Sequence, residues 1–188
     1  MAKILDGKIA ANAIKEEIKS HIKRSGKPVK ITIYQVGDNP ASNTYIRNKQ
    51  KACDEVGIES EVVKLDATPY DELLLLKHLR EEESDGVMVQ LPLPSDYDEH
   101  YFLNCISPSK DIDCLTDASL GKFYSSNNPK LAPCTAQGII DLLDYYNIDI
   151  AGKHAVVVGR SNIVGKPMAM LLLHAHGTVT ICHSRTKD

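Results

Sequence analysis

Short apolar segments alternate along this 188-residue chain with longer segments of helical periodicity, and this alternation limits the fold more than any other feature. Each strand-like run is followed by a segment whose apolar residues recur three or four positions apart. Strands that alternate with helices in this way are typical of a parallel sheet joined by crossover helices. We therefore expect an α/β fold.

The bounds of the expected elements come from periodicity together with proline, glycine and capping residues. We expect helices over residues 9–22, 41–56, 68–80, 99–106, 135–143 and 164–174. We expect strands over residues 31–36, 58–65, 86–91, 154–158 and 178–183. Gly57 should end the second helix, Thr68 with Asp71 should begin the third, and Thr135 should cap the fifth.

Charge and cysteine content exclude several classes of partner. The 22 basic and 25 acidic residues give a net charge of −3, so nothing favours binding to nucleic acid or to an anionic membrane. The five cysteines are widely spaced and include no C-x-x-C pair, which indicates reduced thiols rather than disulfides or a zinc site. The N-terminus lacks the apolar core of a signal peptide, and no apolar run approaches the roughly 20 residues that span a bilayer. We expect a soluble, cytoplasmic protein without a metal ion.

A glycine-containing turn, Gly159-Arg-Ser-Asn-Ile-Val-Gly165, joins a predicted strand to a predicted helix. The first N–H groups of a helix and its positive dipole end suit a pyrophosphate, although a purely structural turn is the alternative. The spacing matches neither G-x-G-x-x-G nor a P-loop. Proteins that bind NAD usually carry an acidic residue near the end of the next strand, whereas this chain has Arg185 there. Together with Arg160 it favours NADP over NAD, unless both are ordinary surface arginines.

Tyr45 and Lys49 are four residues apart on a predicted helix and therefore lie on one face. An amine that is held away from water gives up its proton more readily and can then exchange protons near neutrality. Gln90 ends a predicted strand, and ligands of open α/β sheets bind beyond the carboxyl ends of strands. The loop Lys110-Asp-Ile-Asp113 carries two carboxylates that could bind an amino-pyrimidine. A capping amide at Gln90 and a solvated turn at this loop are the alternatives.

Five motifs in a fixed order resemble one family, that of the bifunctional methylenetetrahydrofolate dehydrogenase/methenyltetrahydrofolate cyclohydrolases. The motifs are Ser42-x-x-Tyr45-x-x-x-Lys49, Val89-Gln-Leu-Pro-Leu-Pro94, Lys110-Asp-Ile-Asp113, Pro133-Cys-Thr135 and Gly159-Arg-Ser-x-x-Val-Gly-x-Pro167. The resemblance runs from the N-terminus to the last residues of the chain. None of the motifs is decisive singly, but the set is highly specific.

The resemblance implies a role for each residue of the folate site. Lys49 would be the general acid and base of cyclohydrolysis and would assist the dehydrogenase step. Gln90 would hydrogen-bond Lys49, Tyr45 would stack along the folate, and Asp113 would anchor the pterin. The residues expected to bind the substrate are Ser42, Tyr45, Val89, Gln90, Leu91, Pro92 and Asp113.

The resemblance also implies the cofactor and the activity. The residues expected at NADP are Gly159, Arg160, Ser161, Val164, Gly165, Ser184 and Arg185, the last two near the 2′-phosphate. Residues 1–140 would form the folate-binding catalytic domain, and residues 141–188 the first part of a Rossmann-type NADP-binding domain. The protein would oxidise 5,10-methylenetetrahydrofolate with NADP and hydrolyse the methenyl product to 10-formyltetrahydrofolate. The family also suggests a homodimer.

Three residues and the length depart from the family's pattern. Cys114 occupies a position that is usually glycine, Ser119 one that is usually asparagine, and Ala136 one that is usually proline. Cys114 matters most, because glycine there could serve a close approach or a positive φ. A doubly wound nucleotide domain has two βαβαβ halves, and this chain supplies two strands of it. In a natural truncation the apolar strands 156–158 and 179–181 would lack partners and favour aggregation, so we expect a fragment of a longer protein instead.

Two other interpretations have to be weighed against this one. A short-chain dehydrogenase also uses a Tyr-x-x-x-Lys pair, but there the glycine-rich turn precedes the pair, whereas Gly159 follows Lys49 here. A folate-binding remnant with cyclohydrolase activity only, or with none, is the other alternative. It is suggested by the missing half of the cofactor domain and by Cys114.

Overall fold

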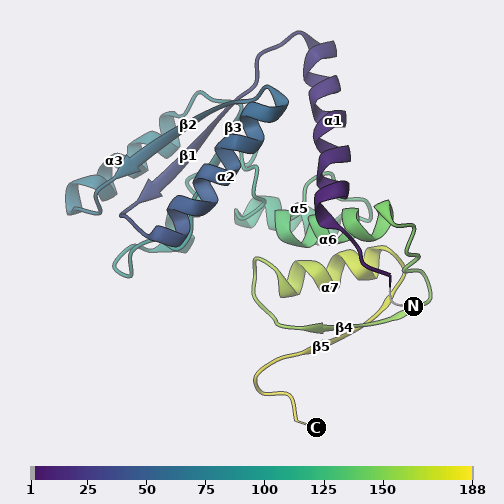
Figure 1. Ribbon diagram of the computed structural model, residues 1–188. Coiled ribbons are helices and arrows are strands. Elements are labelled where there is room, and N and C mark those ends of the chain that lie inside the picture. Colours follow the sequence, from purple (N-terminus) through teal and green to yellow (C-terminus); the bar gives the residue numbers. More distant parts are fainter. Residues whose placement is uncertain (1–2, 188) are drawn as a thin grey trace. The chain divides into compact units, whose positions relative to one another are not determined.

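The computed structural model describes residues 3–187, which form seven helices and five strands (Figure 1). The helices are α1 (Gly7–Ser25), α2 (Pro40–Val56), α3 (Pro69–Glu81), α4 (Glu99–Leu103), α5 (Asp117–Ser125), α6 (Cys134–Tyr145) and α7 (Gly165–His174). The strands are β1 (Lys30–Val36), β2 (Glu59–Leu65), β3 (Gly86–Val89), β4 (His154–Val158) and β5 (Thr178–Cys182).

The described residues fall into two compact units. The N-terminal unit comprises residues 12–112 and 116–118. The C-terminal unit comprises residues 113–115 and 119–187 together with residues 3–11 from the start of the chain. Each unit contains parallel strands joined by helices, so the predicted α/β class is confirmed.

The N-terminal unit is built on a parallel sheet with the strand order β2-β1-β3. Successive side chains of a strand point to opposite faces of its sheet. Ile33 of β1 packs with Met88 of β3 and Ile46 of α2 on one face. Tyr34 points to the other face, where its ring centre lies 5.8 Å from that of His78 on α3. Helices therefore cover both faces, as expected for a parallel sheet.

Helices α2 and α3 begin and end at residues that the sequence marks. The Asn39 side chain caps the N-terminus of α2 by accepting hydrogen bonds from two backbone amides of its first turn. Gly57 ends α2 with a φ of 84°, a left-handed conformation that glycine adopts without strain. Thr68 and Asp71 form a reciprocal capping box at the start of α3. The predictions for Gly57 and for Thr68 with Asp71 are confirmed.

Three features differ from the sequence prediction. Strand β3 ends at Val89 instead of residue 91, because Pro92 has no N–H to extend the ladder. Helix α6 follows Pro133 without any side-chain cap, so Thr135 lies inside its first turn and is not the cap. Helix α5 was not predicted at all. Gly121 lies in its middle and only two of its side chains are buried, so the periodic signal is weak.

The C-terminal unit contains two parallel strands, β4 and β5, with α7 as their crossover. Ala155 and Val157 of β4 pack against a buried cluster that includes Met168 of α7. The alternate side chains of β4 are open to solvent, since Val156 is 56% and Val158 is 85% exposed.

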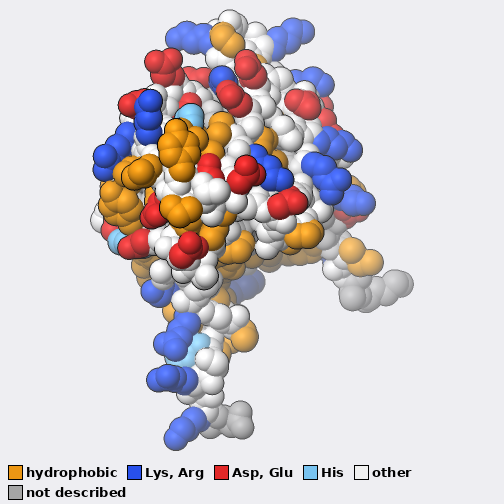
Figure 2. All heavy atoms as spheres, turned by 90° about the vertical axis from the view of Figure 1, so that its left-hand side faces the viewer, with side chains coloured by type: hydrophobic (Ala, Val, Ile, Leu, Met, Phe, Trp, Pro, Cys, Tyr) orange, Lys and Arg blue, Asp and Glu red, His pale blue; other side chains and the backbone are white. Residues whose placement is uncertain are grey.

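The surface of the N-terminal unit carries apolar side chains on α3. Tyr70 and Leu73 are 72% and 66% exposed and lie three residues apart, on one face of the helix. Figure 2 shows hydrophobic side chains gathered among acidic ones on the face of the molecule that carries α3. None of these residues belongs to the predicted site.

Two kinds of structure are not found among residues 3–187. No helix in this range combines the length and the apolar character that crossing a bilayer requires. No group of three or more His, Cys, Asp or Glu side chains in the same range is arranged to hold a metal ion.

Candidate active site

The amine of Lys49 lies at the end of β3, where it meets the side chain of Gln90. Lys49 Nζ donates a hydrogen bond to Gln90 Oε1 at 3.2 Å and lies 3.5 Å from the sulfur of Met88. Gln90 Nε2 in turn donates to the backbone oxygen of Leu91 at 2.7 Å. Because that bond occupies the amide nitrogen, the oxygen of Gln90 is directed at the lysine. The structure therefore brings Lys49 and Gln90 together, as the sequence predicted.

The other predicted folate-site residues of this unit lie on α2 and around the end of β3. Ser42 is buried, whereas the ring of Tyr45 is 63% exposed and presents an open aromatic surface. Both lie within two helical turns of the amine, on the same side of α2. Val89 is only 2% exposed, so its side chain belongs to the core of the sheet. Leu91 and Pro92 follow the strand on its carboxyl side.

The two carboxylates of the predicted folate-binding loop have different surroundings. Asp111 is 3% exposed and accepts a hydrogen bond from the backbone N–H of Thr116 at 2.9 Å. Its backbone forms a parallel bridge with Val87 of β3, so the loop extends the sheet. Asp113 belongs to the C-terminal unit, where the Cys134 thiol donates to its Oδ1 at 3.5 Å. Asp111 thus stabilises the loop, a role that sequence reasoning missed.

Cys114, at a position where the resemblance predicts glycine, has a backbone conformation that favours glycine. Its φ is 58°, in the left-handed region that favours glycine, and its side chain is fully buried. The expectation that this position serves a positive φ is confirmed. Ser119 and Ala136, the other two departures, are 5% and 0% exposed, so both side chains are accommodated inside the structure.

The glycine-containing turn forms a tight link between β4 and α7. Gly159 has a φ of 141°, and a side chain at Gly165 would lie 2.4 Å from the backbone oxygen of Gly159. Ser161 Oγ accepts hydrogen bonds from the backbone N–H groups of Val164 and Gly165, at 3.1 and 3.2 Å. Arg160 is exposed. Glycine is therefore required at residue 165 for close backbone approach, and the hydroxyl of Ser161 stabilises the turn into α7 through these two hydrogen bonds.

A cavity of about 570 Å³ adjoins this turn. Its lining combines the turn with apolar residues of α6, α7 and β4, namely Ile139, Leu143, Val156, Val157, Val158, Gly159, Ser161, Val164, Gly165, Met168 and Leu172. Ser184 and Arg185 follow β5 in the same unit, and both are exposed. The exposed side chains of Arg160 and Arg185 would suit the phosphates of a nucleotide.

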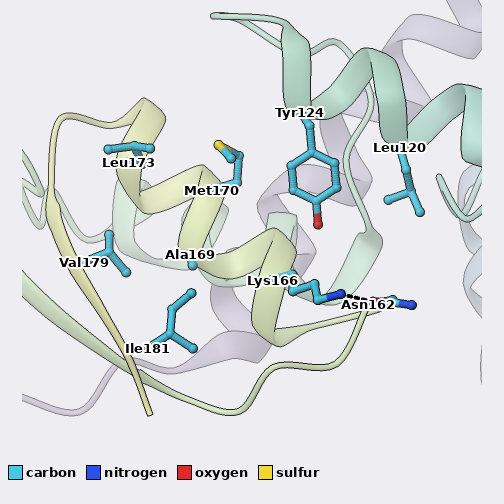
Figure 3. A pocket seen from close by; sticks show the side chains of 9 residues that line it. All are labelled: Leu120, Tyr124, Asn162, Lys166, Ala169, Met170, Leu173, Val179 and Ile181. Carbon is cyan, nitrogen blue, oxygen red and sulfur yellow. Dashed lines mark hydrogen bonds between the residues drawn. The ribbon is translucent and has the colours of Figure 1, made fainter. Parts of the chain in front are cut away.

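A second cavity in the C-terminal unit, of about 520 Å³, is mainly apolar (Figure 3). Most of its lining comes from α7 and β5, with Tyr124 and Leu120 contributed by α5. Lys166 Nζ donates to Asn162 Oδ1 at 2.7 Å, and the hydroxyl of Tyr124 points toward this pair. Burial raises the pKa of Tyr124 above its ordinary value. Sequence reasoning assigned no role to this cavity.

Family profiles match almost the whole chain. The profile described as "Tetrahydrofolate dehydrogenase/cyclohydrolase, catalytic domain" matches residues 5–113. The profile described as "Tetrahydrofolate dehydrogenase/cyclohydrolase, NAD(P)-binding domain" matches residues 133–188. The "Bifunctional protein FolD" of Halothermothrix orenii is 48% identical over 195 residues, which cover 100% of this chain and 69% of that protein. The protein of the same name from Agathobacter rectalis is 46% identical, with the same coverage of both chains.

Solved structures agree with these sequence matches. The bifunctional enzyme FolD of Campylobacter jejuni superposes with a TM-score of 0.91 at 42% identity, over 99% of this chain and 68% of that one. The methylenetetrahydrofolate dehydrogenase-cyclohydrolase of Trypanosoma brucei, solved with NADP and an inhibitor, gives 0.89 at 35% identity, over 98% and 65%. This membership excludes the short-chain dehydrogenase interpretation. The chain belongs to the tetrahydrofolate dehydrogenase/cyclohydrolase family, and it carries that family's catalytic domain followed by the start of its NAD(P)-binding domain.

Proposed function

We propose that this protein oxidises 5,10-methylenetetrahydrofolate with NADP and hydrolyses the 5,10-methenyl product to 10-formyltetrahydrofolate. The observation that supports this most directly is the contact between Lys49 Nζ and Gln90 Oε1 at the carboxyl end of β3. It places one amine, oriented by one amide, where ligands of parallel sheets bind. The matched solved structures from Campylobacter jejuni and Trypanosoma brucei both name a methylenetetrahydrofolate dehydrogenase and a cyclohydrolase.

In the hydrolytic step, the oxygen of a water molecule bonds to the methenyl carbon. The Lys49 amine accepts a proton from that water and delivers it to N5 as the bond between the carbon and N5 breaks. The second proton of the water leaves to solvent as the formyl group forms on N10. Gln90 keeps the amine directed at the reacting carbon, and the exposed ring of Tyr45 stacks on the folate. Asp113 anchors the pterin through its carboxylate.

For the oxidative step, NADP supplies the hydride acceptor when it is bound. Gly159, Ser161 and Gly165 would form the phosphate-binding turn between β4 and α7, in which glycine at residue 165 lets the backbone pack closely against Gly159. Arg160 and Arg185 would bind the 2′-phosphate, which is why we favour NADP over NAD. The boundary at residue 140 between the folate-binding domain and the NADP-binding domain stays a prediction. A homodimer and a cytoplasmic location also stay predictions.

The test is the hydrolysis of 5,10-methenyltetrahydrofolate, followed by the loss of its absorbance. Replacing Lys49 with Met should lower kcat by at least about 100-fold, because general acid–base catalysis contributes that much or more. Lys51→Met is the matched control, since Lys51 lies on the same helix with its side chain 78% exposed. Unchanged turnover in Lys49→Met would remove Lys49 from the mechanism.

A folate-binding protein without catalysis is the second candidate. One observation favours it: Cys114 stands in a left-handed backbone conformation. Saturable binding of tetrahydrofolate by the chain without turnover of either substrate would support this candidate. Measurable hydrolysis that disappears in Lys49→Met would exclude it.

A further inference from the structure

Gln35, at the carboxyl end of β1, is a buried polar residue that the proposed chemistry does not use. Only 4% of its surface is exposed. Its Nε2 donates a hydrogen bond to Asn43 Oδ1 on α2 at 2.6 Å and lies 3.2 Å from the backbone oxygen of Gly37. A buried amide needs such partners, because an unpaired one costs free energy. Here the partners are the turn after β1 and the first turn of α2.

Gln35 and Gln90 lie side by side on neighbouring strands. Tyr34 pairs with Val89 in the parallel register, and the backbone N–H of Gln90 donates to the oxygen of Tyr34 at 2.8 Å. Because side chains alternate along a strand, both glutamines point to the face that α2 covers. Two adjacent amides thus each hold one polar side chain of the same helix. Gln35 holds Asn43, and Gln90 holds Lys49 six residues further on.

Asn43 also contacts Asp38, which forms an ion pair with Lys64 at the same end of the sheet. Asn43 Nδ2 donates to Asp38 Oδ1 at 2.9 Å, and Lys64 Nζ lies 2.7 Å from the same oxygen. Lys64 first, and Asn43 second, lower the pKa of Asp38 below its ordinary value, so the carboxylate stays charged at neutral pH. The start of α2 is therefore connected by side chains to the ends of both β1 and β2.

We propose that Gln35 is a positioning residue. Through Asn43 it fixes where α2 lies along the strands and how α2 is rotated about its own axis, and this keeps the Lys49 amine in contact with Gln90. The importance of this contact for catalysis rests on the proposed function. The position of the amine does not, because it can be measured without any turnover. Ile46 anchors the same helix by packing against Ile33 and Met88, so losing the amide contact should shift α2 without unfolding it.

Competitive acylation of the chain with a small anhydride, read by mass spectrometry, measures the position of the amine. The reactivity of Lys49 is expressed relative to that of Lys51, an exposed lysine on the same helix. Gln35→Leu keeps the size of the side chain but removes the donor, and should raise this ratio roughly two- to tenfold, as for the loss of one net hydrogen bond. Asn43→Ala should do the same. The double variant should exceed neither single one, since both remove the same contact.

Thr32→Val is the matched control. Thr32 is equally buried on β1 and loses one hydrogen bond to Glu82, but it faces the opposite side of the sheet from α2. It should leave the ratio unchanged. A ratio that does not change in Gln35→Leu, or that rises as much in Thr32→Val, would overturn the proposal. Suppose that the Lys49→Met variant hydrolyses 5,10-methenyltetrahydrofolate at the normal rate while Gln35→Leu still raises the reactivity of Lys49. In that case the proposed function is wrong, but the positioning role of Gln35 is supported.

Discussion

Glu82 follows α3, and its carboxylate accepts hydrogen bonds from side chains on the face of β1 opposite α2. The negative charge of this carboxylate should stabilise the fold. The hydroxyl of Tyr34 donates to it, Thr32 Oγ1 donates at 3.2 Å, and the backbone N–H of Ser84 donates at 2.8 Å. Partial burial pushes the pKa of Glu82 upward, but the hydrogen bonds from Tyr34, Ser84 and Thr32 outweigh it and lower the pKa to about 2. The charged form is thus favoured in the folded state.

The size of this stabilisation follows from the two pKa values. A pKa of about 2 in the folded chain against 4.5 in the unfolded chain corresponds to roughly 3 kcal/mol at most. Glu82 keeps some contact with solvent, which screens its interactions, so we expect about 1–2 kcal/mol. Because the folded value is the lower one, this stability is fully present above pH 4.5. It is lost as the pH falls from 4.5 toward 2.

Urea unfolding of the chain at a series of pH values tests this. At pH 7 Glu82→Gln should unfold with a free energy about 1–2 kcal/mol below that of the wild type, and the difference should shrink as the pH falls below 4.5. Glu83→Gln is the control, because Glu83 is the exposed neighbour and should show no such difference. Equal stability at pH 7, or a deficit that stays constant down to pH 3, would refute the reasoning.

Two further predictions concern the C-terminal unit. The Cys114→Gly variant should have a free energy of unfolding in urea about 0.5–1 kcal/mol higher than that of Cys114→Ala, although glycine removes more atoms. The reason is that a φ of 58° is unfavourable for alanine. A more stable alanine variant would contradict this. The apolar cavity beside α7 should bind 1-anilinonaphthalene-8-sulfonate with a rise in its fluorescence. Ile181→Thr should lower that signal while Ile4→Thr, at an 86% exposed site outside the cavity, should not; equal effects would show that the dye binds elsewhere.

Local sequence predicted most of the fold because its signals act over a few residues. The capping box of Thr68 and Asp71 and the left-handed Gly57 are short-range features, and both lie where the sequence indicates. Helix α5 was missed because its burial depends on the distant residues that cover Phe123 rather than on its own periodicity. Thr135 was assigned as a cap by residue type alone, which cannot show whether its oxygen meets a free N–H group.

The candidate site was predictable only where its residues form motifs. Lys49 and Gln90 belong to recognisable segments, and the structure brings them into contact. The contact between Gln35 and Asn43 depends on how α2 packs against β1 after the turn at Gly37. That packing is not visible in a linear sequence. For the same reason the burial of Asp111 could not be predicted, because it depends on the loop that extends the sheet.

The central claim is that the amine of Lys49 lies beside the bound pterin, and the NMR signal of its ε-carbon tests this directly. The chain would be labelled with ¹³Cε-lysine, and Lys49→Met would identify the Lys49 resonance. On saturation with a stable tetrahydrofolate analogue, that resonance should shift while the resonance of Lys51 stays in place. If the analogue binds and the Lys49 signal does not move, the amine is remote from the ligand and the account is wrong.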